Sequence, residues 1–203
     1  LSMERQGFVS ASRFEWDTGV LNAWAHPAQQ VVENFDVRTS FGVACCVGPL
    51  WYRGGFGSAA LHSLIEDIDA TGQIDEMELR GNFALFLRSQ AQCLLLNDAL
   101  GFVRLYASPD ECFYSTSWLA TCAYAGRIDL DDSAAVEYVL LGASHSDRTV
   151  ARGITTLPLG HAFDLGRKHV RPRFPASIWE EARAPASFEA AVDGICEHVQ
   201  TVC

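Results

Sequence analysis

The core of the fold is encoded in residues 78–106, ELRGNFALFLRSQAQCLLLNDALGFVRLY. Two apolar runs, 83–87 and 93–96, flank a polar segment, and this pattern predicts a β-hairpin whose strands are both buried. Gly81 precedes the first run and Gly101 follows the second. Glycine at such positions indicates a sharp turn or the close approach of another backbone. We therefore expect a buried antiparallel hairpin with an unusual backbone conformation at each end.

Further strands are expected around this hairpin. Residues 7–24 alternate loosely about a turn signal at 17–19, which predicts a second hairpin with Trp16 and Trp24 as packing residues. Residues 40–52 are strongly apolar and predict a central strand. Additional strands are expected at 31–37, 112–115 and 154–165, the last with a turn at 158–160.

Four helices are expected, at 58–70, 117–123, 133–141 and 188–199. Ser58 is the expected cap of the first helix. The third is expected to begin at Asp131 or Asp132 and to end at Gly142. The last helix carries an apolar face that we expect either to fray or to pack against a second copy of the chain, as in a homodimer. That face consists of Phe188, Ala191, Val192, Ile195 and Val199.

Composition and charge narrow the class of protein. The chain has 203 residues, 49% of them hydrophobic and 20% charged, as expected of one globular domain plus a fragment of a second. Its net charge of -10 would repel a nucleic-acid backbone, so no nucleic-acid partner is expected. No apolar run is long enough to span a membrane, so no membrane partner is expected. One basic cluster is interpreted as a solvated connector: Arg167, Lys168, His169, Arg171 and Arg173.

The cysteine pattern indicates free thiols. There are seven cysteines, an odd number without Cys-x-x-Cys spacing, which favours a reducing, cytoplasmic location. Cys45 and Cys46 are adjacent in an apolar run, where a strand would point them to opposite faces, and we interpret them as small packing residues. His145 and His161 have no partner at ligand spacing. No metal site is therefore expected.

The glycine-rich segment 53–57, Arg-Gly-Gly-Phe-Gly, has two interpretations. Such a loop before a helix can bind phosphate through its backbone N–H groups. However, no Lys-Ser or Lys-Thr pair follows the glycines, so the segment is not a Walker-type loop. We therefore favour a plain connector.

A set of short motifs follows in order along the chain. They are GNFALFL (81–87), LLLNDALGFVRLY (94–106), FYSTSWLA (113–120), LDDSAAVEYVLLG (130–142) and TVARGITTLPLGHAFDL (149–165). Together they resemble the amidotransferase-like half of the asparagine synthetase family, in which a Gly-x-Phe-Ala strand precedes a second strand, an Asp, a Leu-Gly turn and a Leu-Tyr pair. The resemblance covers about two thirds of the chain, from about residue 61 to the C-terminus. The corresponding residues here are Gly81, Phe83, Ala84, Asp98, Leu100, Gly101, Leu105 and Tyr106.

The resemblance implies a fold and a domain organisation. The fold would be α+β, a four-layer αββα sandwich of the N-terminal-nucleophile hydrolase type with two stacked antiparallel sheets. Residues 1–170 would form a glutamine amidotransferase-like domain, 171–186 a linker, and 187–203 the start of a truncated synthetase domain. ATP and Mg are implied as cofactors of that missing synthetase domain, which would be the partner within the same protein. No cofactor is implied for this chain.

The resemblance also implies what the site lacks. Glutamine hydrolysis in the family needs a cysteine at the mature N-terminus, whose own α-amine acts as its base. No cysteine lies near the start of this chain, so no catalytic residue is assigned. The family holds glutamine with Asn-Gly-Glu, and the matching segment here, Val47-Gly48-Pro49, lacks those polar groups. The former glutamine pocket is assigned to Gly48, Arg53 and Asn82. Gly81, Phe83, Asp98 and Gly101 are assigned as structural residues of the motif, with Asp98 supporting the turn rather than acting in catalysis.

These features predict a degenerate, non-hydrolysing amidotransferase-like domain that serves as scaffold and interface for a synthetase domain. β-Lactam synthetase offers a parallel, because it resembles asparagine synthetase yet lacks the N-terminal nucleophile. The isolated chain is expected to be inactive and its parent protein to be an ATP-dependent ligase. Two alternatives remain open. One is the N-terminal part of a glutamine-hydrolysing asparagine synthetase, and the other is a small-ligand-binding domain that uses the former glutamine pocket.

Overall fold

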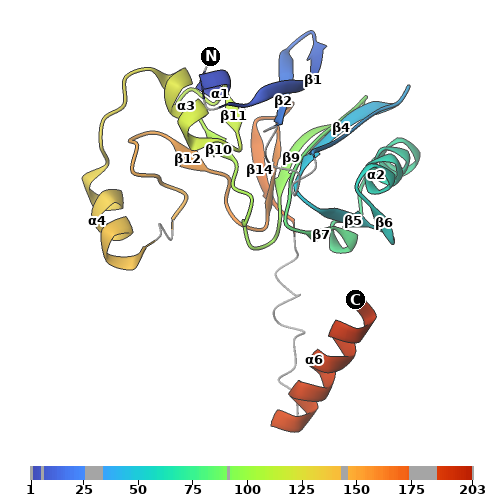
Figure 1. Cartoon of the computed structure of the whole chain (residues 1–203). Helices are drawn as coiled ribbons and strands as arrows, with labels where there is room; N and C mark the ends of the chain where they lie inside the picture. The colour runs from blue at the N-terminus through green and yellow to red at the C-terminus, as the bar shows by residue number, and fades with distance from the viewer. Residues whose placement is uncertain are drawn as a thin grey trace. The chain divides into compact units, whose positions relative to one another are not determined.

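The structure, a computed structural model, describes residues 2–5, 7–25, 34–90, 92–142, 146–173 and 187–202. Residues Leu1–Arg173 form one unit and residues Phe174–Cys203 a second. In the first unit, helices and several antiparallel sheets mix along the chain, as the α+β class predicts (Figure 1). The described part of the second unit is helix α6, Phe188–Val202, where the sequence predicts the last helix.

The largest sheet has six strands and is antiparallel throughout. Its members are β3 (Asn34–Arg38), β4 (Gly42–Val47), β8 (Ala84–Ser89), β9 (Cys93–Asn97), β13 (His161–Asp164) and β14 (His169–Pro172). They are ordered β14-β13-β9-β8-β4-β3. The predicted core hairpin forms β8 and β9 in the middle of the sheet, largely buried, which confirms the prediction. The apolar segment 40–52 supplies the interior strand β4, and the part of the predicted strand 31–37 that precedes Asn34 lies outside the described residues.

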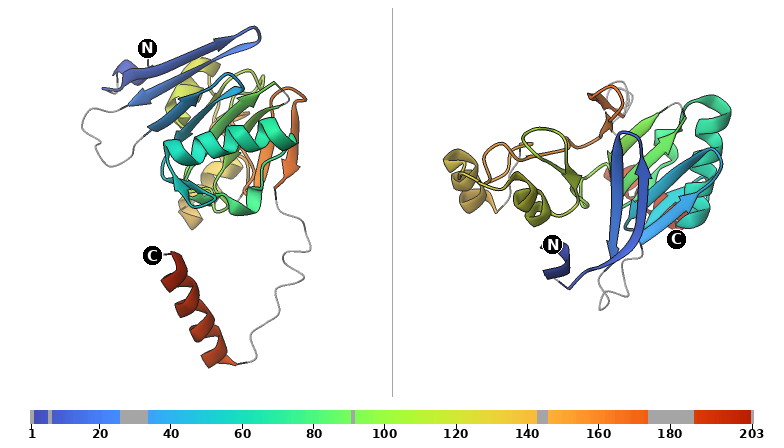
Figure 2. Two further views of the ribbon diagram at one scale, coloured as in Figure 1. Left: turned by 90° about the vertical axis from the view of Figure 1, so that its right-hand side faces the viewer. Right: turned by 90° about the horizontal axis from the view of Figure 1, so that it is seen from above.

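Helix α2, Ser58–Thr71, lies across one face of this sheet (Figure 2, left). Its apolar stripe is buried in the main core, as the spacing predicts. The helix begins after Gly57, and no side chain caps it, so the expectation that Ser58 is the cap is wrong. It ends at Gly72, which has the left-handed conformation typical of a helix stop. The buried residues of α2 are Ala60, Leu61, Leu64, Ile65 and Ile68.

The opposite face of the six-stranded sheet is covered in part by the predicted N-terminal hairpin, so that the sheet lies between this hairpin and α2 (Figure 2, right). The hairpin consists of β1 (Val9–Trp16) and β2 (Gly19–Ala25). The ring of Trp16 stacks on Phe86 with 5.4 Å between ring centres, and Trp24 is half-buried. The hairpin and the packing role of Trp16 are therefore confirmed.

Three short strands complete this second layer. They are β10 (Tyr106–Ala107), β11 (Tyr114–Ser115) and β12 (Thr155–Thr156), ordered β11-β10-β12. The ring of Tyr114 lies 5.0 Å from that of Phe163 in the six-stranded sheet, so the two layers are in contact. Two expectations are corrected here. The predicted strand 154–165 divides at its Pro-Leu-Gly turn into β12 and β13, which lie in different sheets, and the predicted strand 112–115 is only two residues long.

Two short helices follow, and each begins after a residue whose side chain caps it. Helix α3, Trp118–Ala125, is capped by Ser117 and packs against β10 and β11. Helix α4, Asp132–Leu141, is capped by Asp131 and ends at Gly142 as predicted. The remaining described elements are α1 (Ser2–Arg5), β5 (Leu50–Tyr52), β6 (Gly55–Phe56), β7 (Arg80–Gly81) and the 3-10 helix η1 (Glu76–Glu78). Strands β6-β5-β7 form a third small sheet.

A buried ion-pair cluster joins η1 to β14. The carboxylate of Glu76 accepts a hydrogen bond from Arg171 and another, at 3.2 Å, from Nε of Arg173. Arg173 also donates to the backbone carbonyl of Asn97, and its side chain is only 1% exposed. The interpretation of the basic cluster as a solvated connector is therefore wrong for Arg171 and Arg173, whereas the Arg167 side chain is 84% exposed. The first unit accordingly extends through residue 173.

Arg173→Ala should lower the free energy of unfolding by about 3 to 5 kcal/mol, because Glu76 would be left buried with one partner fewer. The matched control is Arg167→Ala, which removes an exposed ion pair with Asp164 and should cost at most about 1 kcal/mol. Urea unfolding followed by circular dichroism measures both. Equal, small losses would show that the cluster does not stabilise the fold.

Candidate functional site

The predicted pocket lies where β4 ends and β8 begins. Val47 pairs with Ala84 in the six-stranded sheet, and Leu50 pairs with Gly81 in the small sheet. The two antiparallel pairs are in the same register, because Leu50 is three residues after Val47 and Gly81 is three residues before Ala84. Segments 48–49 and 82–83 therefore lie side by side where the chain passes from the six-stranded sheet to the small sheet, and we call this place the crossing.

Two glycines allow this crossing. Gly48 has a φ of +90°, and a Cβ at that position would lie 2.2 Å from the backbone oxygen of Asn82. Gly81 has a φ of +112°, and its Cβ would lie 2.2 Å from the backbone oxygen of Pro49. Contacts this short exclude any other residue without a backbone shift. The close approach expected at Gly81 is confirmed, and Gly48 has the same role on the opposite strand.

Arg53 is directed to a different place. It lies in the β5–β6 turn, and its Nη1 donates to Oδ1 of Asp67 on α2 at 2.9 Å. Its guanidinium is 5.6 Å from the ring of Tyr52, whose hydroxyl donates to the same carboxylate. The structure thus brings Gly48 and Asn82 together, and the described contacts of the Arg53 side chain are with α2 and Tyr52. The glycine-rich segment that begins at Arg53 is a tight hairpin turn leading into α2, in line with the connector interpretation.

Asp98 shapes the loop after β9. Its carboxylate accepts the backbone N–H groups of Leu100, Phe102 and Val103 at 3.0 to 3.1 Å. Its own N–H donates to the carbonyl of Phe83, which is buried in the main core. Both carboxylate oxygens therefore hold the turn, as a residue that supports the loop would do. Gly101 lies in this loop with a φ of +66°, and its N–H donates to the carbonyl of Asp98, which confirms the sharp turn expected at this glycine. A Cβ there would be 2.1 Å from the side chain of Leu159.

Asn97 is a polar residue that the sequence analysis did not single out. It ends β9, is 1% exposed, and lies opposite Ala84 on the face that meets the second β layer. Its Nδ2 is 3.5 Å from the carbonyl of Leu157, and its Oδ1 has no hydrogen-bond partner among the described residues. A buried amide oxygen can accept a hydrogen bond from an N–H or O–H group. An asparagine directly after an apolar run was the available signal.

The cysteines of the sheets are not activated. Burial, followed by the charge of Asp36, raises the pKa of Cys45 to about 12. Burial also raises the pKa of Cys93 to about 11 and increases that of Cys46 beyond its ordinary range. A nucleophilic cysteine needs a lowered pKa, so these thiols are unsuited to attack an amide. Cys46 lies in the main core, as its interpretation as a packing residue predicts.

Other ligand chemistry is sparse in the described part of the chain. No group of three or more His, Cys, Asp or Glu side chains is gathered there as a metal would require. The ring of His161 is hydrogen-bonded through Nδ1 to the carbonyl of Leu159 at 2.7 Å, and His145 lies outside the described residues. None of the described helices is both apolar enough and long enough to cross a bilayer.

A scan against protein-family models finds no match to the chain, and a search of curated proteins finds none either. The likeness to the asparagine synthetase family therefore stays a proposal founded on motifs and on the geometry above.

Gly48→Ala and Gly54→Ala form a matched pair that tests the crossing. Both glycines have positive φ, so each alanine should cost about 1 to 2 kcal/mol of unfolding free energy from backbone strain. Nothing lies within 4 Å of a Cβ at Gly54, whereas a Cβ at Gly48 would meet the carbonyl of Asn82. Gly48→Ala should therefore lose about 3 kcal/mol or more in urea unfolding. Equal losses would mean that the crossing has room to relax.

Alkylation should separate the cysteines. Cys112 and Cys196 are exposed and should react with iodoacetamide in the folded protein at pH 8, while buried Cys45 and Cys46 should not. Peptide mapping by mass spectrometry gives the extent of modification, with urea-unfolded protein as the control in which all four react. Because the thiol of Cys45 loses its proton only near pH 12, its labelling should stay slow well above pH 9. Rapid native labelling of Cys45 at pH 8 would contradict the assignment.

Proposed function

We propose that this chain is a degenerate, non-hydrolysing glutamine amidotransferase-like domain of an asparagine synthetase-related, ATP-dependent amide-forming protein, in which it acts as scaffold and interface. The observation that carries the proposal is the residue content of the segment that Gly48 packs against the backbone of Asn82. In the family, the matching segment presents an Asn and a Glu to glutamine. Here the residues on either side of Gly48 are Val47 and Pro49, whose side chains have no polar group.

The layer order supports the proposed four-layer αββα sandwich. Helix α2 covers one face of the six-stranded sheet, and the β1–β2 hairpin with the three short strands covers the other. Helix α3 then packs on the outer side of the short strands, where Trp118 and Cys122 meet Ile154. A helix, two β layers and a further helix therefore follow one another, which is the arrangement that the N-terminal-nucleophile hydrolase type requires.

The chemistry of the described residues favours loss of hydrolysis. Attack on a side-chain amide needs a thiolate and N–H donors aimed at the oxyanion. The thiols of Cys45 and Cys46 keep their protons at neutral pH because they are buried, and an internal cysteine has no free α-amine to act as base. Proline at position 49 has no N–H to donate. Asp98 is occupied with three backbone N–H groups, so it is not free to bind a substrate ammonium.

The proposed partner is the synthetase domain of the same protein, where ATP and Mg would bind and the carboxylate would be activated. With ATP bound by the synthetase domain, this chain needs no phosphate site of its own. Its glycine-rich segment at 53–57 is accordingly a hairpin turn. A cytoplasmic location belongs to the same proposal and rests on the pattern of free thiols.

A second candidate function is favoured by Asn97 alone. Its Oδ1 has no hydrogen-bond partner among the described residues, and the residue is buried where β9 ends, near the segments that carry Gly48 and Asn82. A small molecule with an N–H or O–H donor would satisfy it. Isothermal titration with L-glutamine, repeated on Asn97→Leu, tests this alternative. Saturable binding that the substitution abolishes would favour the ligand-binding function over the scaffold.

The purified chain should release no ammonia from glutamine above the background of buffer. The reason is the absence of an activated thiol and of oxyanion donors at the described site. A coupled glutamate dehydrogenase assay measures the ammonia, and a known glutaminase at matched concentration is the positive control. Ammonia release that iodoacetamide pretreatment abolishes would overturn the proposal and support the alternative of a glutamine-hydrolysing asparagine synthetase.

A further inference from the structure

The outer face of the small sheet β6-β5-β7 exposes two aromatic side chains. Along β5, Leu50 and Tyr52 are fully buried, whereas Trp51 between them is 43% exposed. A strand places alternate side chains on opposite faces, so Trp51 lies on the solvent face of this sheet. Phe56 is the cross-strand partner of Trp51 and is 46% exposed. The sheet therefore buries one face and presents an aromatic pair on the other, and we call this pair the aromatic platform.

The domain supports both rings of the platform. The ring centres of Trp51 and Phe56 are 4.8 Å apart, and Phe56 meets Phe35 edge-on at 5.4 Å. Phe35 is half-buried and packs against the main core. The ring of Trp51 lies close to the backbone of Gly81, since a Cβ at that position would be 3.1 Å from its Cε3. Rings supported in this way lose little freedom when a ligand stacks on them.

An arginine without an ion-pair partner lies beside the platform. Arg80 on β7 is the second cross-strand partner of Trp51, and the Cβ atoms of such partners are about 5 Å apart on the same face. Arg80 is exposed and forms no ion pair with any described residue. Arg53, in the β5–β6 turn, is by contrast paired with Asp67. A guanidinium binds an anionic oxygen pair through two parallel N–H bonds, so Arg80 is available to an anion.

The size of the surface favours a small molecule as the occupant. Two aromatic side chains that are each less than half exposed offer on the order of 200 Å² of surface. A stable protein–protein interface needs about 800 Å² from each partner. The net charge of -10 disfavours a nucleic-acid strand. One ring system with an anionic group matches both the area of the platform and the charge of Arg80.

The spacing of the side chains favours a carboxylate over a phosphate. Because Arg80 is the immediate neighbour of Trp51, an anion attached to the stacked ring directly or through one carbon can reach the guanidinium. A nucleotide has a ribose between its base and its phosphate, which places the anion farther from the ring. Its phosphate also carries nearly two negative charges, and this acidic chain repels two charges more strongly than one.

We propose that Trp51, Phe56 and Arg80 form a binding site for a small aromatic carboxylate. The ring of the ligand stacks on Trp51, and its carboxylate pairs with the guanidinium of Arg80. Both platform rings stay in part exposed to solvent, so binding is weak, with a dissociation constant of about 1 mM for a ligand of about a dozen heavy atoms. This inference goes beyond the function proposed above and does not depend on it.

Proton–nitrogen correlation NMR of the full chain tests the site, with indole-3-acetate as the probe. The indole N–H signal of Trp51, assigned by its loss in Trp51→Phe, should shift and saturate with a dissociation constant of about 1 mM. Indole, which lacks the carboxylate, should bind at least about fivefold more weakly, and acetate alone should not shift this signal. Adenosine monophosphate should also bind more weakly. The absence of a saturable shift up to about 10 mM indole-3-acetate, or tighter binding of the nucleotide, would overturn the proposal.

Arg80→Gln tests the role of the guanidinium. It should raise the dissociation constant of indole-3-acetate at least about fivefold and leave that of indole unchanged, because only the carboxylate contacts the guanidinium. Arg104→Gln is the matched control, since Arg104 is also exposed and its loss changes the net charge by the same amount. This control should leave both constants unchanged, and the spectra show whether each variant is folded. Equal weakening in the two variants would assign the effect to net charge, and no weakening in Arg80→Gln would exclude Arg80 from the site, so either result contradicts the proposal.

Discussion

The carboxylate of Glu76 is buried, and the arrangement of the first unit depends on its neutralisation. A charge taken out of water costs several kcal/mol unless partners replace the lost hydration. Two arginines supply that replacement, and both come from the C-terminal end of the unit, about 95 residues away in sequence. Arg173 also donates to the carbonyl that ends β9. One polar cluster therefore fixes the edge strand β14 against the segment that leads into β7 and β8.

The ladder pairings place the ends of β4 and β9 beside the start of β8. There the chain uses its special residues for backbone contact: Gly48 and Gly81 each face a carbonyl of the other strand, and Asp98 gathers the N–H groups of its own loop. A Cβ at position 48 has no room, so this crossing requires a glycine there. Asn97 is the exception, as a polar side chain with an unused acceptor.

Local signals predicted most of the secondary structure. The continuous apolar runs predicted β8 and β9, and the cap expected at Asp131 or Asp132 predicted where α4 begins. The failures involve partners distant in sequence. Arg171 and Arg173 looked like solvated charges because nothing nearby indicates Glu76, and Arg53 was placed in the pocket although its carboxylate partner, Asp67, is on α2. The segment 154–165 was predicted as one strand but forms two strands in different sheets. Apolar periodicity alone does not reveal that the turn at 158–160 redirects the chain.

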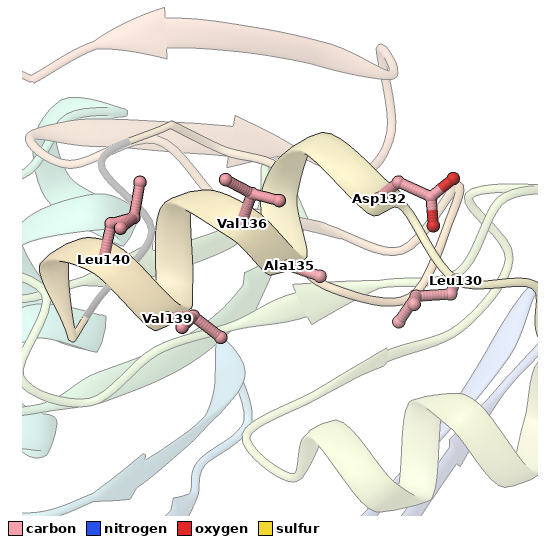
Figure 3. A pocket seen from close by; sticks show the side chains of 6 residues that line it. All are labelled: Leu130, Asp132, Ala135, Val136, Val139 and Leu140. Carbon is pink, nitrogen blue, oxygen red and sulfur yellow. The ribbon is translucent and has the colours of Figure 1, made fainter.

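The central sheet of the first unit and helix α4 are held in place by different kinds of interaction. Inside the first unit, charge is compensated at Glu76 and apolar surface is buried on both faces of the central sheet. At α4 the roles of polar and apolar groups are reversed, because a polar cap anchors the helix and its apolar side chains face outward. Helix α4 is held at its N-terminus by the Asp131 cap and by Arg148, and Ala134 is its one fully buried residue. The apolar side chains that α4 exposes (Figure 3) therefore add to the exposed surface of the domain rather than to its core.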